Sequence, residues 1–177
     1  LDAQVRRMLQ DPKARTLVDQ FMMQWLQLQR LRTAQPDVDR FPAFNDQLRA
    51  AMQTETELFL GAIIREDRSV LDILDGDFTY LNGPLAKHYG ILDTAGNRVG
   101  GNPKQKKPGG QPINPRSPAF VRVSLGGTDR GGVLTQASVL TVTSNPTRTS
   151  PVKRGKWVLE QLLGAPPPPP PPDGIPE

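Results

Sequence analysis

The stretch NDQLRAAMQTETELFLGAIIRE, residues 45–66, has a clear helical pattern. Asn45 belongs to the residue types that cap helix N-termini, so we expect a helix from Asp46 to about Glu66. The apolar residues of the predicted buried face recur at helical spacing: Leu48, Met52, Phe59, Ala62 and Ile63. The pattern therefore predicts an amphipathic helix that packs against the rest of the chain along one side.

Glu55 lies on the apolar face of this predicted helix, because apolar residues stand three positions before it and four after it. A carboxylate on a buried face needs a partner. We interpret Glu55 as a structural buried charge that pairs with Arg148 or Arg154. Acid–base catalysis by Glu55, Glu57 and His88 is the alternative, but no motif places a nucleophile or a second carboxylate beside them.

Helical spacing also marks the segment before residue 33. Asp11 and Pro12 have the pattern of an N-cap followed by proline in the first turn, and we expect Phe21, Met22 and Trp25 to form the core of the helix that follows. Residues 33–44 contain two prolines and little periodicity. They predict a loop whose two phenylalanines pack onto the protein.

Shorter elements are expected in the second half. Asn82 is a typical cap for a short helix, and Ser150 followed by Pro151 begins the last helix. Residues 120–124 alternate like a strand, which would need a partner strand. Residues 133–143 are ambiguous between strand and helix, and we favour a helix.

These elements predict a mainly α fold, an irregular helical bundle with long loops and at most a short β element near 119–124. Four regions follow from the composition. We expect a helical domain at 1–92, a flexible Gly/Pro/Lys-rich insertion at 93–118, a second small, mainly helical unit at 119–164, and a polyproline linker at 165–177.

The composition of the 177-residue chain excludes several kinds of site. Without cysteine the chain has no disulfide, no thiolate metal ligand and no covalent haem attachment of its own. A single histidine excludes a His-rich metal site, so we expect no metal and no cofactor within this chain. No apolar run approaches the roughly 20 residues that span a bilayer, and no signal peptide is present.

The net charge of +4 comes mostly from residues after 97, which suggests an anionic partner or a solvated basic loop. Nucleic-acid binding is not favoured, because the lysines lie in a loop without aromatic residues. The start of the last helix carries four candidate anion- or partner-binding residues: Arg148, Ser150, Lys153 and Arg154. A phosphate, sulfate, carboxylate or haem propionate would suit them. In the alternative interpretation Ser150 only caps its helix and the basic residues pair with Glu55 or Glu57.

Several motifs together resemble a known family pattern. They are QWL (24–26), TETELF (54–59), REDRSVL (65–71), FTYLN (78–82), LAKHYG (85–90), RGGVLTQAS (130–138) and TRTSPVKRG (147–155). The chain resembles the paired domains of unknown function found in large, secreted, cytochrome-c-associated proteins of planctomycete-type bacteria. This resemblance implies a periplasmic or otherwise extracytoplasmic location and haem c in a downstream domain, attached at a Cys-x-x-Cys-His site beyond the prolines.

The run of seven prolines, Pro166 to Pro172, predicts a polyproline II spacer about 20 Å long that would separate two bodies. We therefore expect a noncatalytic helical module that positions or docks a downstream haem domain or a redox partner. His88 is a candidate axial ligand for such a haem, or else a surface histidine. The alternative is a part of a multidomain oxidoreductase or polymer-degrading enzyme whose active site needs further domains.

Overall fold

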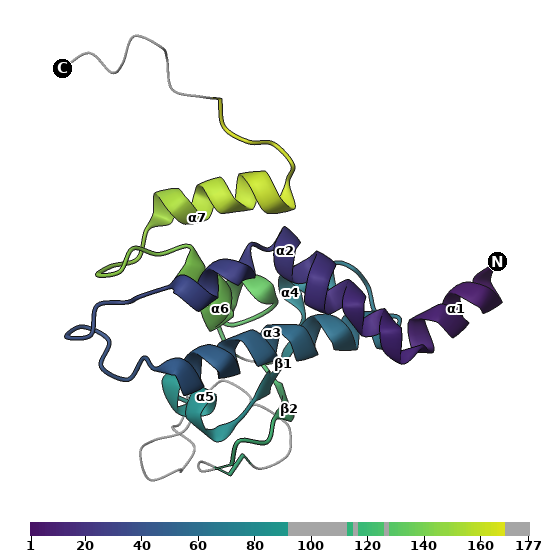
Figure 1. Cartoon of the computed structure of the whole chain (residues 1–177), viewed down its shortest axis with the longest axis horizontal. Coiled ribbons are helices and arrows are strands. Elements are labelled where there is room, and N and C mark those ends of the chain that lie inside the picture. The colour runs from purple at the N-terminus through teal and green to yellow at the C-terminus, as the bar shows by residue number, and fades with distance from the viewer. Residues whose placement is uncertain (92–112, 115–116, 126–127, 169–177) are drawn as a thin grey trace.

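The computed structural model describes residues 1–91, 113–114, 117–125 and 128–168 (Figure 1). The described residues are mainly helical, with one two-stranded antiparallel sheet. The predicted fold class is therefore confirmed. The predicted insertion at 93–118 lies largely outside the described residues, and the predicted linker is described only as far as residue 168.

The elements follow one another in this order: α1 (Asp2–Gln10), η1 (Pro12–Ala14), η2 (Leu17–Met22), α2 (Met23–Trp25), η3 (Leu28–Thr33), α3 (Asp46–Arg65), α4 (Asp72–Asp75), β1 (Phe78–Leu81), α5 (Gly83–His88), β2 (Val121–Ser124), η4 (Val133–Thr135), α6 (Ala137–Val142), α7 (Pro151–Trp157) and η5 (Val158–Leu162). Of the η segments, η2 and η5 are π-helical and the others are 3-10 helices.

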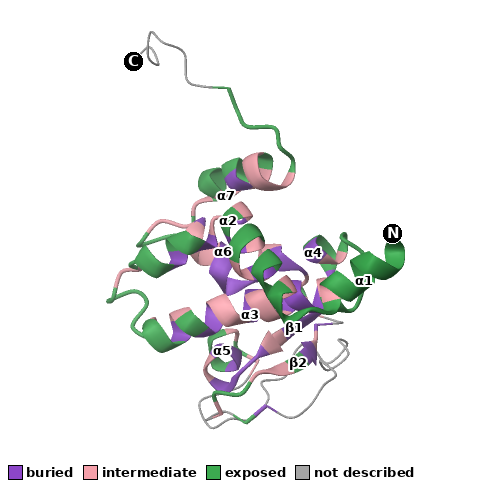
Figure 2. Cartoon of the chain, turned by 45° about the vertical axis from the view of Figure 1, so that its right-hand side comes forward, coloured by how far each residue is buried: buried purple, intermediate pink, exposed green. Residues whose placement is uncertain are grey.

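Helix α3 runs through the middle of the fold, between α2 and α6 on one side and α5 and the sheet on the other (Figure 1). It begins as predicted, because the Asn45 side chain accepts a hydrogen bond of 2.9 Å from the Leu48 amide. Phe59 and Leu60 belong to one buried apolar cluster, and Leu48 and Met52 to a second. Figure 2 shows buried positions along much of α3. One helix thus serves two adjoining cores.

The predicted core of the preceding segment is wrong at Phe21, which is 57% exposed. The buried residues there are instead Val18, Met23, Leu26 and Leu28. The cause is the π-helical turn η2, whose wider hydrogen-bond spacing rotates the following side chains away from a 3.6-residue register. Gln27 then adopts a left-handed conformation, with φ of 56°, and ends α2.

The predicted strand at 120–124 is β2, and its partner is β1, which sequence analysis did not identify as a strand. The two pair antiparallel, with Phe78 opposite Ser124 and Leu81 opposite Val121. The motif FTYLN thus supplies a strand followed directly by a cap, since Asn82 accepts a 3.0 Å hydrogen bond from the Leu85 amide at the start of α5. The cap was predicted and the strand was not.

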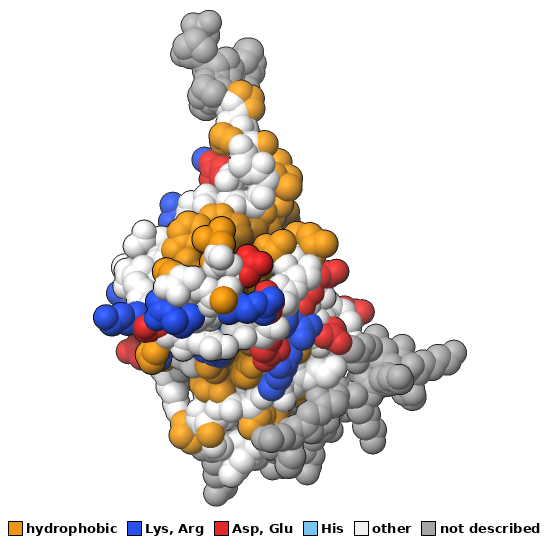
Figure 3. Space-filling model, turned by 90° about the vertical axis from the view of Figure 1, so that its right-hand side faces the viewer, with side chains coloured by type: hydrophobic (Ala, Val, Ile, Leu, Met, Phe, Trp, Pro, Cys, Tyr) orange, Lys and Arg blue, Asp and Glu red, His pale blue; other side chains and the backbone are white. Residues whose placement is uncertain are grey.

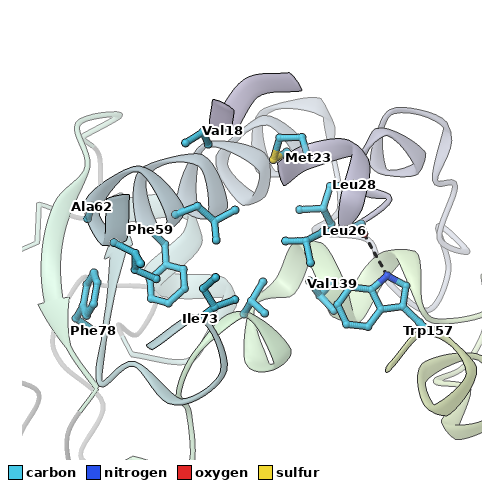
Figure 4. Packing of buried hydrophobic residues seen from close by; sticks show 13 residues of the cluster. Val18, Met23, Leu26, Leu28, Phe59, Ala62, Ile73, Phe78, Val139 and Trp157 are labelled. Atoms are coloured by element: carbon cyan, nitrogen blue, oxygen red, sulfur yellow. Dashed lines mark hydrogen bonds between the residues drawn. The ribbon is translucent and has the colours of Figure 1, made fainter. Parts of the chain in front are cut away.

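The segments on either side of the insertion share their interior. Val139 and Trp157 pack in the same cluster as Leu26 and Phe59 (Figure 4). Val123 and Ala137 belong to the second cluster together with residues of α3 and α5. The predicted regions 1–92 and 119–164 therefore contribute to common cores rather than to separate ones.

The helix favoured at 133–143 is present as η4 followed by α6. Gln136 occupies the N-cap position without a capping side-chain bond. The Thr135 hydroxyl instead donates to the Gly131 carbonyl at 3.0 Å and so closes the turn before η4. This turn positions Arg130, which is described below.

Gly132 lets the same turn approach α4 closely. Its φ of 56° combined with ψ of −173° is a conformation that essentially only glycine adopts. Its amide donates to the Gly76 carbonyl at 3.0 Å. A Cβ atom at Gly132 would overlap the carbonyl oxygen of Leu74. Two backbone segments far apart in sequence are therefore in contact at a position that has no room for a side chain.

We predict that Gly132→Ala lowers the free energy of unfolding by about 3 kcal/mol or more, because backbone strain and overlap act together. Gly155→Ala is the matched control. Gly155 lies in α7 with nothing within 4 Å of a Cβ atom, so alanine there should raise stability by up to about 1 kcal/mol. Urea unfolding of both variants checks this, and equal stabilities would contradict the close approach.

Candidate functional site

Glu55 is 1% exposed and lies in the middle of α3, between the sheet and the end of α5. Its carboxyl accepts hydrogen bonds from the Thr79 hydroxyl at 2.6 Å and from the Tyr89 hydroxyl at 2.5 Å. The Tyr89 oxygen in turn accepts a 2.7 Å bond from the amide of Ala137, the first residue of α6. One buried carboxyl thus connects α3, β1, the residue after α5 and the start of α6.

The expected pairing of Glu55 with Arg148 or Arg154 is wrong. Arg154 donates instead to the hydroxyls of Thr143 at 3.3 Å and Thr149 at 3.1 Å. The cation that acts on Glu55 is Arg130. Its charge lowers the pKa of the Glu55 carboxyl, although the two side chains form no salt bridge. Sequence spacing shows that Glu55 is buried, but it does not show which distant side chain reaches it.

Glu57 does not pair with the predicted arginines either. Its carboxylate accepts a 2.7 Å hydrogen bond from Gln53 and lies 4.0 Å from the Arg15 guanidinium. The same alternative interpretation holds that Ser150 caps the last helix. This cap is present, since the Ser150 hydroxyl accepts a 3.3 Å hydrogen bond from the Lys153 amide. That alternative is therefore correct for Ser150 and wrong for the ion pairs.

Burial raises the pKa of Glu55 from its ordinary value of 4.5 to about 7, although the bonds from Thr79 and Tyr89 favour the charged form. Desolvation and the nearby Glu55 charge raise the pKa of Tyr89 well above 10, so its hydroxyl stays protonated and remains a donor. The loss of water around a buried carboxyl therefore outweighs two short hydrogen bonds and the charge of Arg130.

A second set of buried polar groups lies beside this carboxyl. The Thr56 hydroxyl is 2.7 Å from the Gln136 side-chain oxygen and 2.7 Å from the Ser138 hydroxyl. These contacts join α3 to the start of α6, next to the bond between Tyr89 and Ala137. They involve amide and hydroxyl groups, which hold helices together but do not activate a nucleophile.

Arg130 lies above the Tyr89 ring. Its guanidinium carbon is 4.3 Å from the ring centroid, and one of its nitrogens donates to the Thr135 carbonyl at 2.9 Å. The two contacts fix the orientation of the guanidinium. Partial desolvation lowers the pKa of the neighbouring His88, and the charge of Arg130 lowers it further. The His88 imidazole is therefore uncharged at neutral pH. The role of His88 as an axial haem ligand stays a prediction.

A pocket of about 650 Å³ opens beside Tyr89 and Arg130. It is bounded by the loop before α3, by the end of α5, by α6 and by the loop before α7. In Figure 1 the two loops lie side by side, at the end of the molecule away from α1. They are joined by a 3.0 Å bond from the Asp37 amide to the Pro146 carbonyl and a 3.3 Å bond from Arg40 to the Thr147 carbonyl.

Four arginines line this pocket: Arg40, Arg130, Arg148 and Arg154. Arg148 and Arg154 were predicted as anion-binding residues, whereas Ser150 and Lys153 do not line it. Arg40 and Arg130 were missed as site residues. Arg130 stands in the motif RGGVLTQAS, but nothing in the sequence indicates that this motif lies beside the loop that carries Arg40.

The charges around the pocket are of one sign. Among the described residues that line it, none is aspartate or glutamate. Arg40, Arg130 and Arg154 donate four side-chain hydrogen bonds to described residues, all to carbonyl or hydroxyl oxygens, which are neutral. The pocket therefore gathers positive charge that no carboxylate in its wall neutralises.

The opposite end of the molecule, near α1, carries charges of both signs. A second pocket, of about 810 Å³, lies between α1 and α3 and is lined by residues of both charges. Arg6 pairs with Asp67 at 3.2 Å, and Arg15 with Asp19 at 3.0 Å. Figure 3 shows basic and acidic side chains mixed on this face. Its charges largely compensate one another, and we do not assign it a charged ligand.

The part of the chain that the structure describes holds no group of three or more acidic or histidine side chains suited to a metal ion. No helix there is long and apolar enough to cross a membrane.

Two family models match the chain. PSD4, described as a protein of unknown function (DUF1592), matches residues 1–91, which is more than half of the chain. The chain belongs to the DUF1592 family. PSCyt3, described as a protein of unknown function (DUF1588), matches residues 130–177. The paired arrangement expected from the sequence motifs is thus confirmed.

No curated protein and no solved structure matches the chain. The candidate site lies where the DUF1592 and DUF1588 segments meet. Glu55, His88 and Tyr89 come from the first segment, and Arg130 and Arg148 from the second. Neither segment alone forms the pocket.

The raised pKa of Glu55 predicts a specific dependence of stability on pH. The folded state binds the Glu55 proton more tightly than the unfolded state does. The stability that this proton contributes is therefore fully present below pH 4.5 and is lost as the pH rises through about 7. The loss should reach about 3 kcal/mol. Urea unfolding at pH 4.5, 6 and 8 measures it.

Glu55→Gln is the control, because glutamine does not titrate and its amide oxygen replaces one of the two carboxyl oxygens that accept from Thr79 and Tyr89. The difference in stability between wild type and this variant should change with pH by the same amount. A constant difference across the range would show that Glu55 has an ordinary pKa.

Proposed function

We propose that this DUF1592 chain is a noncatalytic helical module of an extracytoplasmic, c-type-cytochrome-associated multidomain protein. In this proposal it holds a downstream haem domain at a defined position through the proline segment. The support comes from the sequence resemblance, from the two matched family models and from the way in which the last helix is attached to the core.

The observation that carries the proposal is the attachment of α7 and η5. The buried Trp157 donates from its indole nitrogen to the Leu26 carbonyl at 3.1 Å (Figure 4). In the reverse direction, Trp25 donates to the Gln161 carbonyl at 2.5 Å. Two indoles, one from each side, thus join the last helical segment to the segment around α2.

Three residues, Leu163, Gly164 and Ala165, separate this anchored helix from the prolines. The described ones, residues 166–168, are exposed. Proline has no backbone N–H donor and a restricted φ, so such a run is a stiffer spacer than a glycine-rich segment would be. An anchored helix with a stiff extension suits positioning, whereas catalysis would need an assembled set of reacting groups.

The test uses the parent protein with its haem. Because this chain has no cysteine, Arg32→Cys at an exposed position gives a single site within it for a fluorophore, whose energy transfer to the haem reports their distance. The double variant Trp25→Phe/Trp157→Phe removes both indole donors and keeps aromatic rings. We expect a broader distance distribution with an unchanged haem spectrum.

Leu163→Ala, at an exposed position just after η5, is the matched control and should leave the distribution unchanged. The proposal fails if the parent reading frame encodes no Cys-x-x-Cys-His site. It also fails if the double variant and the control give the same distribution as wild type.

A further inference from the structure

We propose that the arginine-lined pocket binds a small organic anion, with a flat apolar body and a carboxylate or phosphate head. This inference concerns a ligand of the chain itself and does not depend on the haem-positioning function. It rests on the volume of the pocket, the nature of its walls and its uncompensated charge.

The volume and the walls suit a small molecule. About 650 Å³ lies within the range of roughly 300–1,000 Å³ that is typical of small-molecule sites. Phe41 and Phe44 from the loop before α3 and Leu140 from α6 provide apolar surface. Phe41 is 44% exposed, so part of its ring is available for contact. A flat apolar body would remove this surface from water.

Two of the four arginines are held in place. Arg130 is fixed by the Tyr89 ring and the Thr135 carbonyl, and Arg154 by the hydroxyls of Thr143 and Thr149. A guanidinium has five N–H donors, so each of these two keeps donors that the protein does not use. Because their positions are set before a ligand arrives, binding costs little further ordering.

The other two arginines are free to close on a ligand. Arg40 and Arg148 are both exposed. Arg40 makes one long side-chain bond, of 3.3 Å, to the Thr147 carbonyl. The Arg148 side chain makes no hydrogen bond or ion pair with the described residues. Their guanidinium forks match the two oxygens of a carboxylate or two of a phosphate.

Two carboxylates near the pocket, Asp37 and Glu55, do not form part of its wall. The Asp37 carboxylate accepts a 2.9 Å bond from the Arg40 backbone amide and does not line the pocket. Glu55 is behind Tyr89, bound to its hydroxyl, and is likewise absent from the wall. An anion that enters would therefore meet donors and no repelling carboxylate.

The experiment titrates the whole chain with naphthalene-2-carboxylate and with 2-naphthyl phosphate, followed by ligand-observed NMR. The neutral 2-naphthamide and acetate are the comparison compounds. The test variant is Arg40→Gln/Arg148→Gln. The matched control is Arg30→Gln/Arg32→Gln, which removes two exposed arginines outside the pocket and so lowers the net charge equally.

We expect saturable binding of at least one naphthyl anion to wild type and to the control, and at least tenfold weaker binding to the test variant. Loss of charge-assisted hydrogen bonds accounts for such a change. Naphthamide and acetate should each bind at least tenfold more weakly than that anion. Whichever of the two anions binds identifies the head group.

Three results would overturn the proposal: no saturable binding of either naphthyl anion, equal weakening in the test variant and the control, or binding of naphthamide or acetate as tight as that of the anion. Urea unfolding of both double variants shows whether the fold is kept. Because the exchanged arginines are exposed, we expect unchanged unfolding midpoints.

Discussion

The hydroxyl of Tyr89 is the contact on which the arrangement of the second half depends. It donates to the carboxyl of Glu55 and accepts from the amide of Ala137. The first bond satisfies a buried carboxyl, and the second satisfies an orphan amide at the start of α6. A single side chain therefore bridges α3 and α6, next to the direct contacts of Thr56 with Gln136 and Ser138. Leaving either partner unsatisfied would cost about 1–3 kcal/mol.

The pocket is a consequence of this arrangement. With α6 held against α3, the loop before α7 meets the loop before α3, and the arginines of both loops line one pocket with Tyr89. The close approach of Gly132 to α4 places Arg130 there as well. The arginine pocket and the buried carboxyl are thus parts of one structure, built jointly by the DUF1592 and DUF1588 segments.

Local signals in the sequence predicted local structure well. Asn45, Asn82 and Ser150 cap helices as expected, since capping depends on residues within one turn. The prediction failed at Phe21, where a π-helical turn changes the periodicity on which the inference depended. The partner of β2 was missed for a related reason: β1 is short, and its pairing is visible only across the insertion.

The sequence by itself determined the helical class, the burial of Glu55 and the basic character of the segment around Arg148. These properties follow from spacing and composition. Only the tertiary structure decided that Glu55 binds Thr79 and Tyr89 and that Arg40 and Arg130 join Arg148 at one pocket. Glu55 and Thr79 are 24 positions apart, and Arg40 and Arg148, which line the same pocket, are 108 positions apart. Periodicity within one element carries no information about such arrangements.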